Sequence, residues 1–248
     1  VRLFNDDLFR TAVWNSTRLA LVVPLVTITI ALIFASLITV GGSGKGNVRG
    51  LAGSDFYRVV SFFPYAIPAI VIALMWRLIF DPNIGLINGI LTALGLDQFE
   101  SYPWLGRVAT AMPVTMFVII WGMVGFYMLL FIAAIKGVPA ETFEAARLDG
   151  VNAWQMFRNI TVPSVRPTLV VVLTTIIIAT LKIFDIPRTM TGARFDTQVL
   201  ANMMYDQSFT FGNNGIGSAL AVMIFVLVIP VVVFNVRQMI INREVRGV

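Results

Sequence analysis

Five apolar stretches, each about as long as a membrane-crossing helix, constrain the fold of this chain more than any other feature. A helix needs about 20 apolar residues to cross about 30 Å of hydrocarbon. Lipid offers no partners to backbone polar groups, so such stretches must form helices or a closed barrel. They are continuously apolar rather than alternating, which favours helices. The stretches lie at about Leu19–Val40, Val59–Phe80, Pro113–Ile135, Leu169–Pro187 and Ile216–Val236. We therefore expect an all-α membrane protein, a polytopic helix bundle with five visible spans.

The composition agrees with this class and excludes several others. Of the 248 residues, 58% are hydrophobic and 12% are charged, against about 25% charged in soluble domains. The chain has no Cys and no His, which excludes thiolate metal sites, His ligands and Ser-His-Asp triads. Nearly all Asp and Glu residues fall in predicted loops. We expect no metal site and no enzymatic activity, so uphill transport would need energy from another chain or from an ion gradient.

The basic residues predict an orientation. With the loop after the third span taken as cytoplasmic, ten Lys and Arg residues fall inside and seven outside, as the positive-inside tendency requires. Topology thus accounts for the net charge of +5, and no nucleic-acid partner is expected. This orientation places Val1 outside and predicts a sixth span upstream. Residues 3–17 mix apolar and polar side chains, which predicts an interfacial amphipathic helix or a poorly ordered lead-in.

Two glycine- and proline-bearing segments interrupt the apolar pattern. Pro64 and Pro68 stand at the start of the second span, where each removes a backbone donor and favours a kink. Such breaks line the cargo cavity in many transporters, although they also simply mark helix starts. The glycine-rich run 41–46 lacks the spacing of a phosphate-binding loop. It predicts a flexible loop.

A polar island, Lys136–Arg166, separates the third and fourth spans. Val138–Glu141 predicts a helix start with proline in the first turn, and Gly150 predicts its end. Asn152 predicts the cap of a second helix, Ala153–Ile160, which carries aromatic and apolar residues on one face. A connector needs only a handful of residues. The island therefore predicts a compact knob, either a docking surface or a self-packed cap.

The knob carries a family resemblance. Its residues match the EAA signature of ABC-importer permeases, E-A-A-x3-G-x9-I-x-L-P, with Val162 at the usual Leu; the matching residues are Glu144, Ala145, Ala146, Gly150, Ile160 and Pro163. Pro64–Trp76 and Gly85–Asn88 resemble the carbohydrate branch, similar to maltose and glycerol-phosphate systems. The resemblance implies a type I permease fold with six spans. It also implies a single transmembrane permease domain over residues 1–248, an EAA coupling loop at about 137–167, and a prokaryotic cytoplasmic membrane.

The resemblance also implies partners and a mechanism. It implies a second permease subunit, usually a different chain, a cytoplasmic ATPase dimer that holds ATP and Mg, an extracytoplasmic sugar-binding protein, and the lipid bilayer. This chain itself would bind no cofactor. The ATPase-coupling residues would be Glu144, Ala145, Ala146, Arg147, Asp149, Gly150 and Pro163. Closure of the motor would move the coupling helices and reorient the spans around a midplane site.

Two further sets of residues are expected to face the cargo or the binding protein. The outer loop Pro187–Gly215 is interpreted as a docking surface, with an undecorated connector as the alternative; its candidates are Arg188, Arg194, Asp196, Tyr205 and Asn213. Lys182 and Asp185 would lie inside the outer half of the fourth span, as a cavity lining or as a local pair at i, i+3 near the interface. Tyr65, Trp121 and Tyr127 would offer aromatic faces to a sugar or serve as packing.

The cargo expected from the branch is a disaccharide such as maltose, trehalose or another α-glucoside. Glycerol-phosphate, polyols and oligosaccharides stay open. A secondary transporter or a structural scaffold is the competing interpretation, but neither accounts for the EAA knob.

Overall fold

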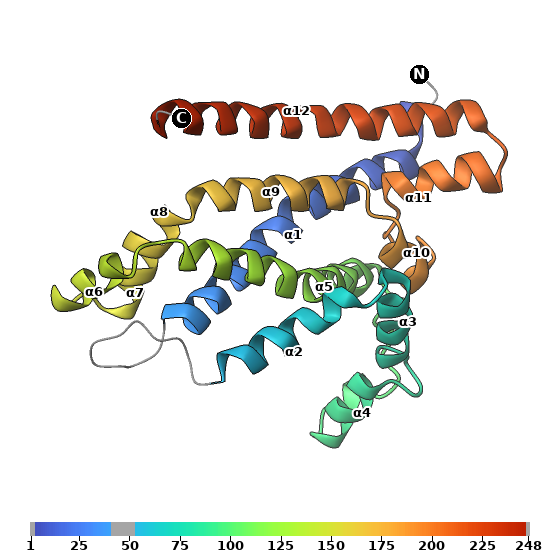
Figure 1. Cartoon of the computed structure of the whole chain (residues 1–248). Coiled ribbons are helices and arrows are strands. Elements are labelled where there is room, and N and C mark those ends of the chain that lie inside the picture. Colours follow the sequence, from blue (N-terminus) through green and yellow to red (C-terminus); the bar gives the residue numbers. More distant parts are fainter. Residues whose placement is uncertain (1–2, 41–52, 247–248) are drawn as a thin grey trace. The chain divides into compact units, whose positions relative to one another are not determined.

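The fold is helical throughout the part of the chain that the computed structural model describes, residues 3–40 and 53–246 without the side chains of Phe4 and 239–246. Three helices in these ranges are long and apolar enough to cross a membrane: α1 (Asp7–Val40), α5 (Val108–Lys136) and α12 (Asn214–Arg246, apolar to Gln238). Two bent helix pairs bring the possible spans to five, the number that the sequence predicts. Figure 1 shows the order of the elements. The loop expected at 41–46 lies outside the described residues.

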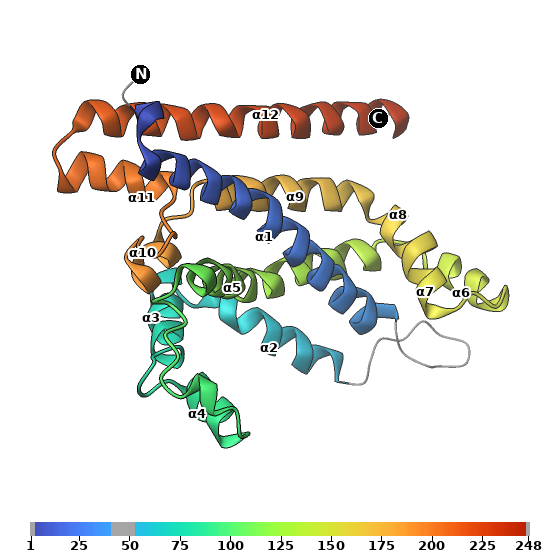
Figure 2. The same cartoon turned by 180° about the vertical axis from the view of Figure 1, so that it is seen from behind.

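Contacts divide the chain into two compact units. Unit 1 comprises residues 1–23, 67–122 and 176–231, and unit 2 comprises residues 24–66, 123–175 and 232–248. Figures 1 and 2 show α1 as one uninterrupted helix, although its residues are shared between the two units. Each unit therefore draws on three separated parts of the chain.

Unit 1 contains short helices that connect the longer ones. These are α3 (Ala69–Ile79), α4 (Leu86–Ala93), η2 (Asp97–Phe99), α10 (Asp185–Thr191), α11 (Leu200–Tyr205) and η4 (Asp206–Thr210). One apolar cluster joins α1, α11 and α12 through Phe9, Ala12, Leu200, Met203 and Leu220. Residues 7–17 form the start of α1, so a helix that leads into the first span is present as expected, and its position at the membrane interface stays a prediction. A short η1 (Leu3–Asn5) precedes α1, whose first turns bury Phe9 and Ala12 and expose Leu8 and Trp14.

Unit 2 contains the remaining short helices, which include the polar island. These are α2 (Ser54–Ala66), α6 (Ala140–Leu148), α7 (Ala153–Met156), η3 (Phe157–Thr161), α8 (Val162–Ser164) and the first part of α9 (Arg166–Leu181). α2 and α5 approach backbone to backbone, because a Cβ at Gly125 would collide with the Ser61 carbonyl. The Asn235 amide donates to Thr174 Oγ1 at 2.9 Å, which ties the end of α12 to α9.

Two of the five expected spans are interrupted. The second breaks at Ile67–Pro68, between the end of α2 and the start of α3, as the proline pair predicts. Proline cannot donate a backbone hydrogen bond, and it disfavours helical geometry in the residue before it. In the fourth expected span, α9 ends at Leu181 rather than at Pro187. Pro187, in the first turn of α10, has no N–H to donate to the Ile183 carbonyl and so cannot continue the helix.

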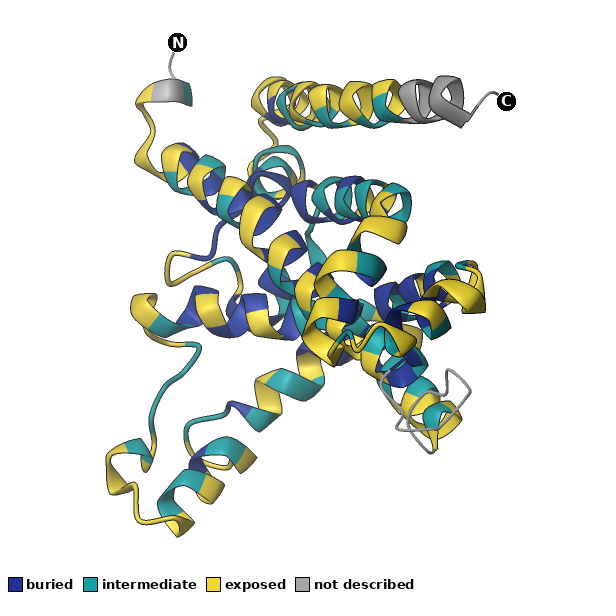
Figure 3. Ribbon diagram, turned by 90° about the vertical axis from the view of Figure 1, so that its left-hand side faces the viewer, coloured by how far each residue is buried: buried dark blue, intermediate teal, exposed yellow. Residues whose placement is uncertain are grey.

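Helix α12 is mostly exposed along its apolar length (Figure 3). Only 6% of its most apolar stretch is buried, and large apolar side chains such as Phe225 and Val226 are exposed. In water such a surface would be unfavourable. It suits a helix surrounded by lipid, where every backbone polar group is satisfied within the helix.

Candidate functional site

The EAA segment, defined here as residues 139–165, folds from local signals. Pro139 is the N-cap of α6, and Asp149 is the C-cap. Gly150 follows with φ +75°, which side chains other than glycine rarely adopt. Val151 N–H donates to the Ala146 carbonyl at 3.0 Å and Gly150 N–H to the Arg147 carbonyl at 3.1 Å. These two bonds form the Schellman motif that ends many helices, so Gly150 terminates the helix as predicted.

The second helix of the segment begins at the predicted cap and continues differently. Asn152 and Gln155 form a reciprocal capping box, with both bonds at 2.9 Å. After Met156 the helix widens into the π-helix η3, where Thr161 Oγ1 donates to the Met156 carbonyl at 3.3 Å. The chain then runs through exposed Pro163 in α8 and bends by 74° into α9. The predicted helix end at Ile160 is therefore wrong, because π and α turns carry it to Ser164.

The buried and exposed faces of α6 separate cleanly. Phe143 and Ala146 are buried, whereas Ala145, Asp149 and Gly150 are exposed and Glu144 is half-buried. Two large apolar side chains also face outward, Leu148 at 89% exposure and Trp154 at 64%, with Trp154 stacked on Phe157. Sequence reasoning missed Leu148 as a surface residue. Exposed apolar groups rimmed by polar ones are typical of protein-binding surfaces.

Arg147 has a role that the sequence does not reveal. Its Nη2 donates to the Val40 carbonyl at 2.7 Å, and Val40 is the last residue of α1. The last carbonyls of a helix lack partners within it, and a cation is favourable there. Arg147 therefore fastens α6 to the end of α1 within unit 2.

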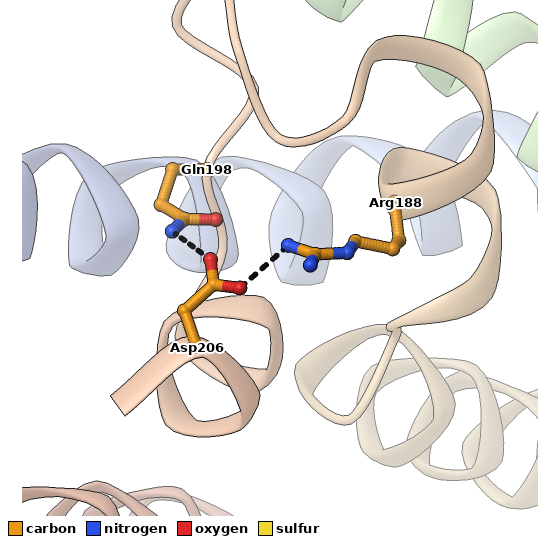
Figure 4. Close-up of polar contacts among 3 residues, drawn as sticks. All are labelled: Arg188, Gln198 and Asp206. Carbon is orange, nitrogen blue, oxygen red and sulfur yellow. Dashed lines mark hydrogen bonds and ion pairs between the residues drawn. The ribbon is translucent and has the colours of Figure 1, made fainter. Parts of the chain in front are cut away.

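In unit 1, the predicted outer loop is mostly helical rather than irregular. Arg188 on α10 forms an ion pair with Asp206 on η4 at 2.7 Å, and Gln198 Nε2 donates to the same carboxylate at 3.3 Å (Figure 4). The Arg188 guanidinium also lies over the Tyr205 ring, 5.3 Å from its centroid. Arg188 and Tyr205, expected together on a docking surface, are thus in contact and hold α10, α11 and η4 together.

Residues 192–198 form a tightly held turn. Ala193, Phe195 and Asp196 all have positive φ, between 53° and 60°, at a cost of roughly 1–3 kcal/mol each. Fully buried Asn15 donates to the carbonyls of Asp196 at 2.7 Å and Gln198 at 3.0 Å. The surrounding contacts thus maintain a strained backbone. Arg194 and Asp196 are exposed on this turn, and Asn213 is exposed before α12.

The residues expected on the substrate path belong to both units. Tyr65 stacks on Phe126 with ring centroids 4.4 Å apart, and Phe126 in turn contacts buried Tyr127. Trp121 belongs to unit 1, where it packs edge-on against Trp76 at 5.3 Å. Lys182 lies in the break after α9 and Asp185 begins α10. Neither enters an ion pair among the described residues, so the expected i, i+3 pair is wrong.

Unit 1 also holds a cavity of about 660 Å³ that sequence reasoning did not anticipate. It lies among the end of α3, the turn after it, residues 103–106, α10 and the strained turn. Three arginines and one carboxylate line it: Arg77, Arg188, Arg194 and Asp81. The described residues contain no group of three or more acidic side chains that could hold a metal ion.

Comparisons with known proteins agree with this architecture. Residues 28–247 match the family model of the binding-protein-dependent transport system inner membrane component. The chain belongs to this family. The permease is 44% identical to the diacetylchitobiose uptake system permease protein NgcF of Streptomyces coelicolor, over 99% of this chain and 70% of that one. It is 38% identical to the alpha-glucoside transport system permease protein AglF of Rhizobium meliloti, over 95% and 68%.

A solved structure confirms the fold. A chain of a bacterial ABC transporter that imports the acidic polysaccharide alginate superimposes with a TM-score of 0.83 at 21% identity, over 96% of this chain and 80% of that one. The predicted fold class, an all-helical ABC-importer permease in the inner membrane, is confirmed. The permease is a transport subunit, and its EAA signature, residues 144–163, lies within the residues that the family model matches.

Proposed function

We propose that this permease forms half of the translocation pathway of an ATP-driven, binding-protein-dependent sugar importer. The observation that carries the proposal is the exposed EAA segment, held by a Schellman motif and a capping box, in a family-member chain. The domain would be one transmembrane permease domain over residues 1–248, with the coupling loop at about 137–167. The other half of the pathway would come from a second permease chain.

The EAA segment would receive force from a cytoplasmic ATPase dimer, which would bind ATP and Mg. Ala145 and Gly150 present little side chain, so a partner backbone can approach closely. Exposed Leu148 and Trp154 would enter an apolar groove, and Glu144 would pair with a basic ATPase residue. Asp149 would offer a second acidic contact, and Pro163 would fix the exit into α9.

The cargo would be a disaccharide. The two relatives named above carry the names of uptake systems for diacetylchitobiose and for alpha-glucosides. The cargo expected to be maltose-like or trehalose-like is therefore extended to N-acetylated disaccharides. Glycerol-phosphate and polyols stay alternatives. Tyr65 is exposed and Trp121 is half-buried, and each would offer an aromatic face to the sugar within its own unit. Lys182, in the break after α9, would offer a hydrogen-bond donor.

An extracytoplasmic sugar-binding protein would dock on unit 1. The exposed candidates there are Arg194, Asp196 and Asn213, whereas Arg188 and Tyr205 would support the surface from beneath through their mutual contact. Within this orientation the EAA segment is cytoplasmic, as the distribution of basic residues predicts.

The charge reversal Glu144→Lys tests the coupling role. We expect the variant to insert and assemble with its partner permease, but to lose ATPase co-purification and uptake of radiolabelled diacetylchitobiose and maltose. Glu141→Lys is the matched control, because Glu141 is an exposed acid on the same helix outside the signature, and it should transport normally. Normal uptake and normal ATPase co-purification in Glu144→Lys would reject the proposal.

A further inference from the structure

The cavity in unit 1 is lined by more arginines than carboxylates. Of its arginines, Arg188 is already neutralised by Asp206. Arg77, in the last turn of α3, and Arg194 enter no ion pair among the described residues. The single carboxylate of the lining, Asp81, accepts from the backbone N–H groups of Asn83 at 2.9 Å and Ile84 at 3.1 Å. Both of these bonds go to Asp81 Oδ1, and the two guanidinium groups outnumber the one carboxylate, so the lining has a net positive charge.

The wall that carries Arg194 is pre-organised. Thr197 Oγ1 donates to the Arg194 carbonyl at 2.6 Å, and its hydroxyl also hydrogen-bonds that of Thr191 at 2.5 Å. With Asn15, these contacts hold a turn that contains three strained residues. Backbone strain of this kind persists only where the surroundings over-determine it, and it concentrates at functional sites. A ligand that meets Arg194 would therefore not have to order the backbone of this turn.

The size and charge of the cavity limit its occupant. A volume of about 660 Å³ lies within the range of ligand pockets, and guanidinium groups bind carboxylates through charge-assisted, often bidentate hydrogen bonds. The disaccharide cargo proposed above is uncharged, so it gives the two arginines no ionic partner. A protein that docks on the same unit and inserts an acidic side chain into the cavity would give both arginines an ionic partner.

We infer that this cavity is the socket for an Asp or Glu side chain of the extracytoplasmic binding protein, held between Arg77 and Arg194. The inference rests on the proposed function, since it assumes that the binding protein docks on unit 1. It narrows the expected docking surface to one anchoring contact, and it adds Arg77, which lies 111 residues before Arg188, the first of the other candidates.

The test uses the complete transporter in proteoliposomes with its purified, sugar-loaded binding protein. Arg77→Gln and Arg194→Gln should each raise the binding-protein concentration for half-maximal ATPase stimulation about tenfold, as expected for the loss of one charged contact. The maximal stimulated rate should stay unchanged, and the salt dependence should become shallower. Arg107→Gln is the matched control, because Arg107 is an exposed arginine of the same unit that lies over Tyr102 outside the cavity; it should behave as wild type.

A charge exchange then identifies the acid. Arg194→Glu should abolish stimulation, and one Asp→Arg or Glu→Arg variant of the binding protein should restore it. Wild-type half-stimulation in both Gln variants, equal shifts in Arg107→Gln, or the absence of any rescuing variant would each overturn the socket. An altered dependence on a uronate sugar with unchanged half-stimulation would assign the cavity to cargo and overturn it too. If the wild-type complex is itself not stimulated, the proposed function fails rather than the socket.

Discussion

The EAA segment of unit 2 and residues 185–214 of unit 1 are both polar in sequence, but they differ in how far away in the sequence their stabilising partners lie. Each is a polar interruption between apolar helices, and each forms several short helices. Three of the six signature residues of the EAA segment are exposed, Ala145, Gly150 and Pro163. The caps and turns of the segment are closed by bonds between residues at most five positions apart, and Arg147 adds one bond to Val40 of α1. Residues 197–203 of the other segment are buried, and Asp196, Gln198 and Leu200 bond partners 181 to 184 positions away in α1.

The difference shows what separates a protruding contact surface from a packed one. A segment closed by its own caps keeps its shape when a partner moves it, which suits a part that transmits force. A segment whose polar groups are satisfied by another helix keeps its shape only while that helix stays in contact. The two segments should therefore respond differently to the same kinds of change.

The largest effect is expected at the turn that closes α6. Gly150→Pro cannot adopt φ +75°, because the pyrrolidine ring holds φ near −65°, and it also removes the bond to the Arg147 carbonyl. Uptake should fall by more than about 100-fold while the protein still inserts, since a 1 Å misplacement alone costs that much in a positioned site. Uptake by whole cells and membrane abundance measure the two effects. Gly150→Asn, which tolerates the left-handed region, should retain most transport, and equal loss in both variants would show that the turn geometry is not the cause.

The next effect concerns the long-range support of unit 1. Asn15→Leu leaves the carbonyls of Asp196 and Gln198 without their buried donor, although it also removes the unpartnered Asn15 Oδ1. We expect a net destabilisation of about 2 kcal/mol and faster amide hydrogen exchange in residues 194–200. Exchange mass spectrometry of the purified permease measures this. Asn213→Leu is the control, because the exposed Asn213 side chain bonds the nearby Gln207 side chain rather than residues of α1. Unchanged amide protection of residues 194–200 in Asn15→Leu would show that the turn does not depend on α1.

The same contrast explains what the sequence predicts and what it does not. The family, the five spans, the break at Pro68, the stop at Gly150 and the cap at Asn152 all follow from local chemistry or a contiguous signature. The break after Leu181 was missed, because the apolar run continues through it and only Pro187 marks the change. Arg147, the Arg188–Asp206 pair and the basic cavity depend on tertiary contacts that no spacing encodes.

A middle-sized effect is expected where the EAA segment meets α1. Arg147→Met loses the bond to the Val40 carbonyl, so α6 should move without carrying α1 with it, and uptake should fall about tenfold, the equivalent of about 1.4 kcal/mol. ATP hydrolysis and ATPase co-purification should persist, which separates loss of positioning from loss of the partner. Arg147→Lys keeps a charged donor at the helix end and should recover part of the uptake. Loss of ATPase co-purification in Arg147→Met would instead make Arg147 a direct contact of the motor.

The smallest effects are expected from two ion pairs that test the comparison in its simplest form. The Arg188–Asp206 pair of unit 1 joins separate helices, with side chains 32% and 18% exposed, and Asp206 also accepts from Gln198. Asp206→Asn keeps the shape and removes the charge, so the thermal midpoint in detergent should fall by a few degrees, as for about 1–2 kcal/mol. The Asp55–Arg58 pair of unit 2 lies within one turn of α2, and Asp55 is 91% exposed, so Asp55→Asn should leave the midpoint unchanged, as is usual for exposed pairs. Equal shifts of the thermal midpoint in the two variants would mean that the ion pair between helices of unit 1 stabilises the protein no more than the exposed pair of unit 2.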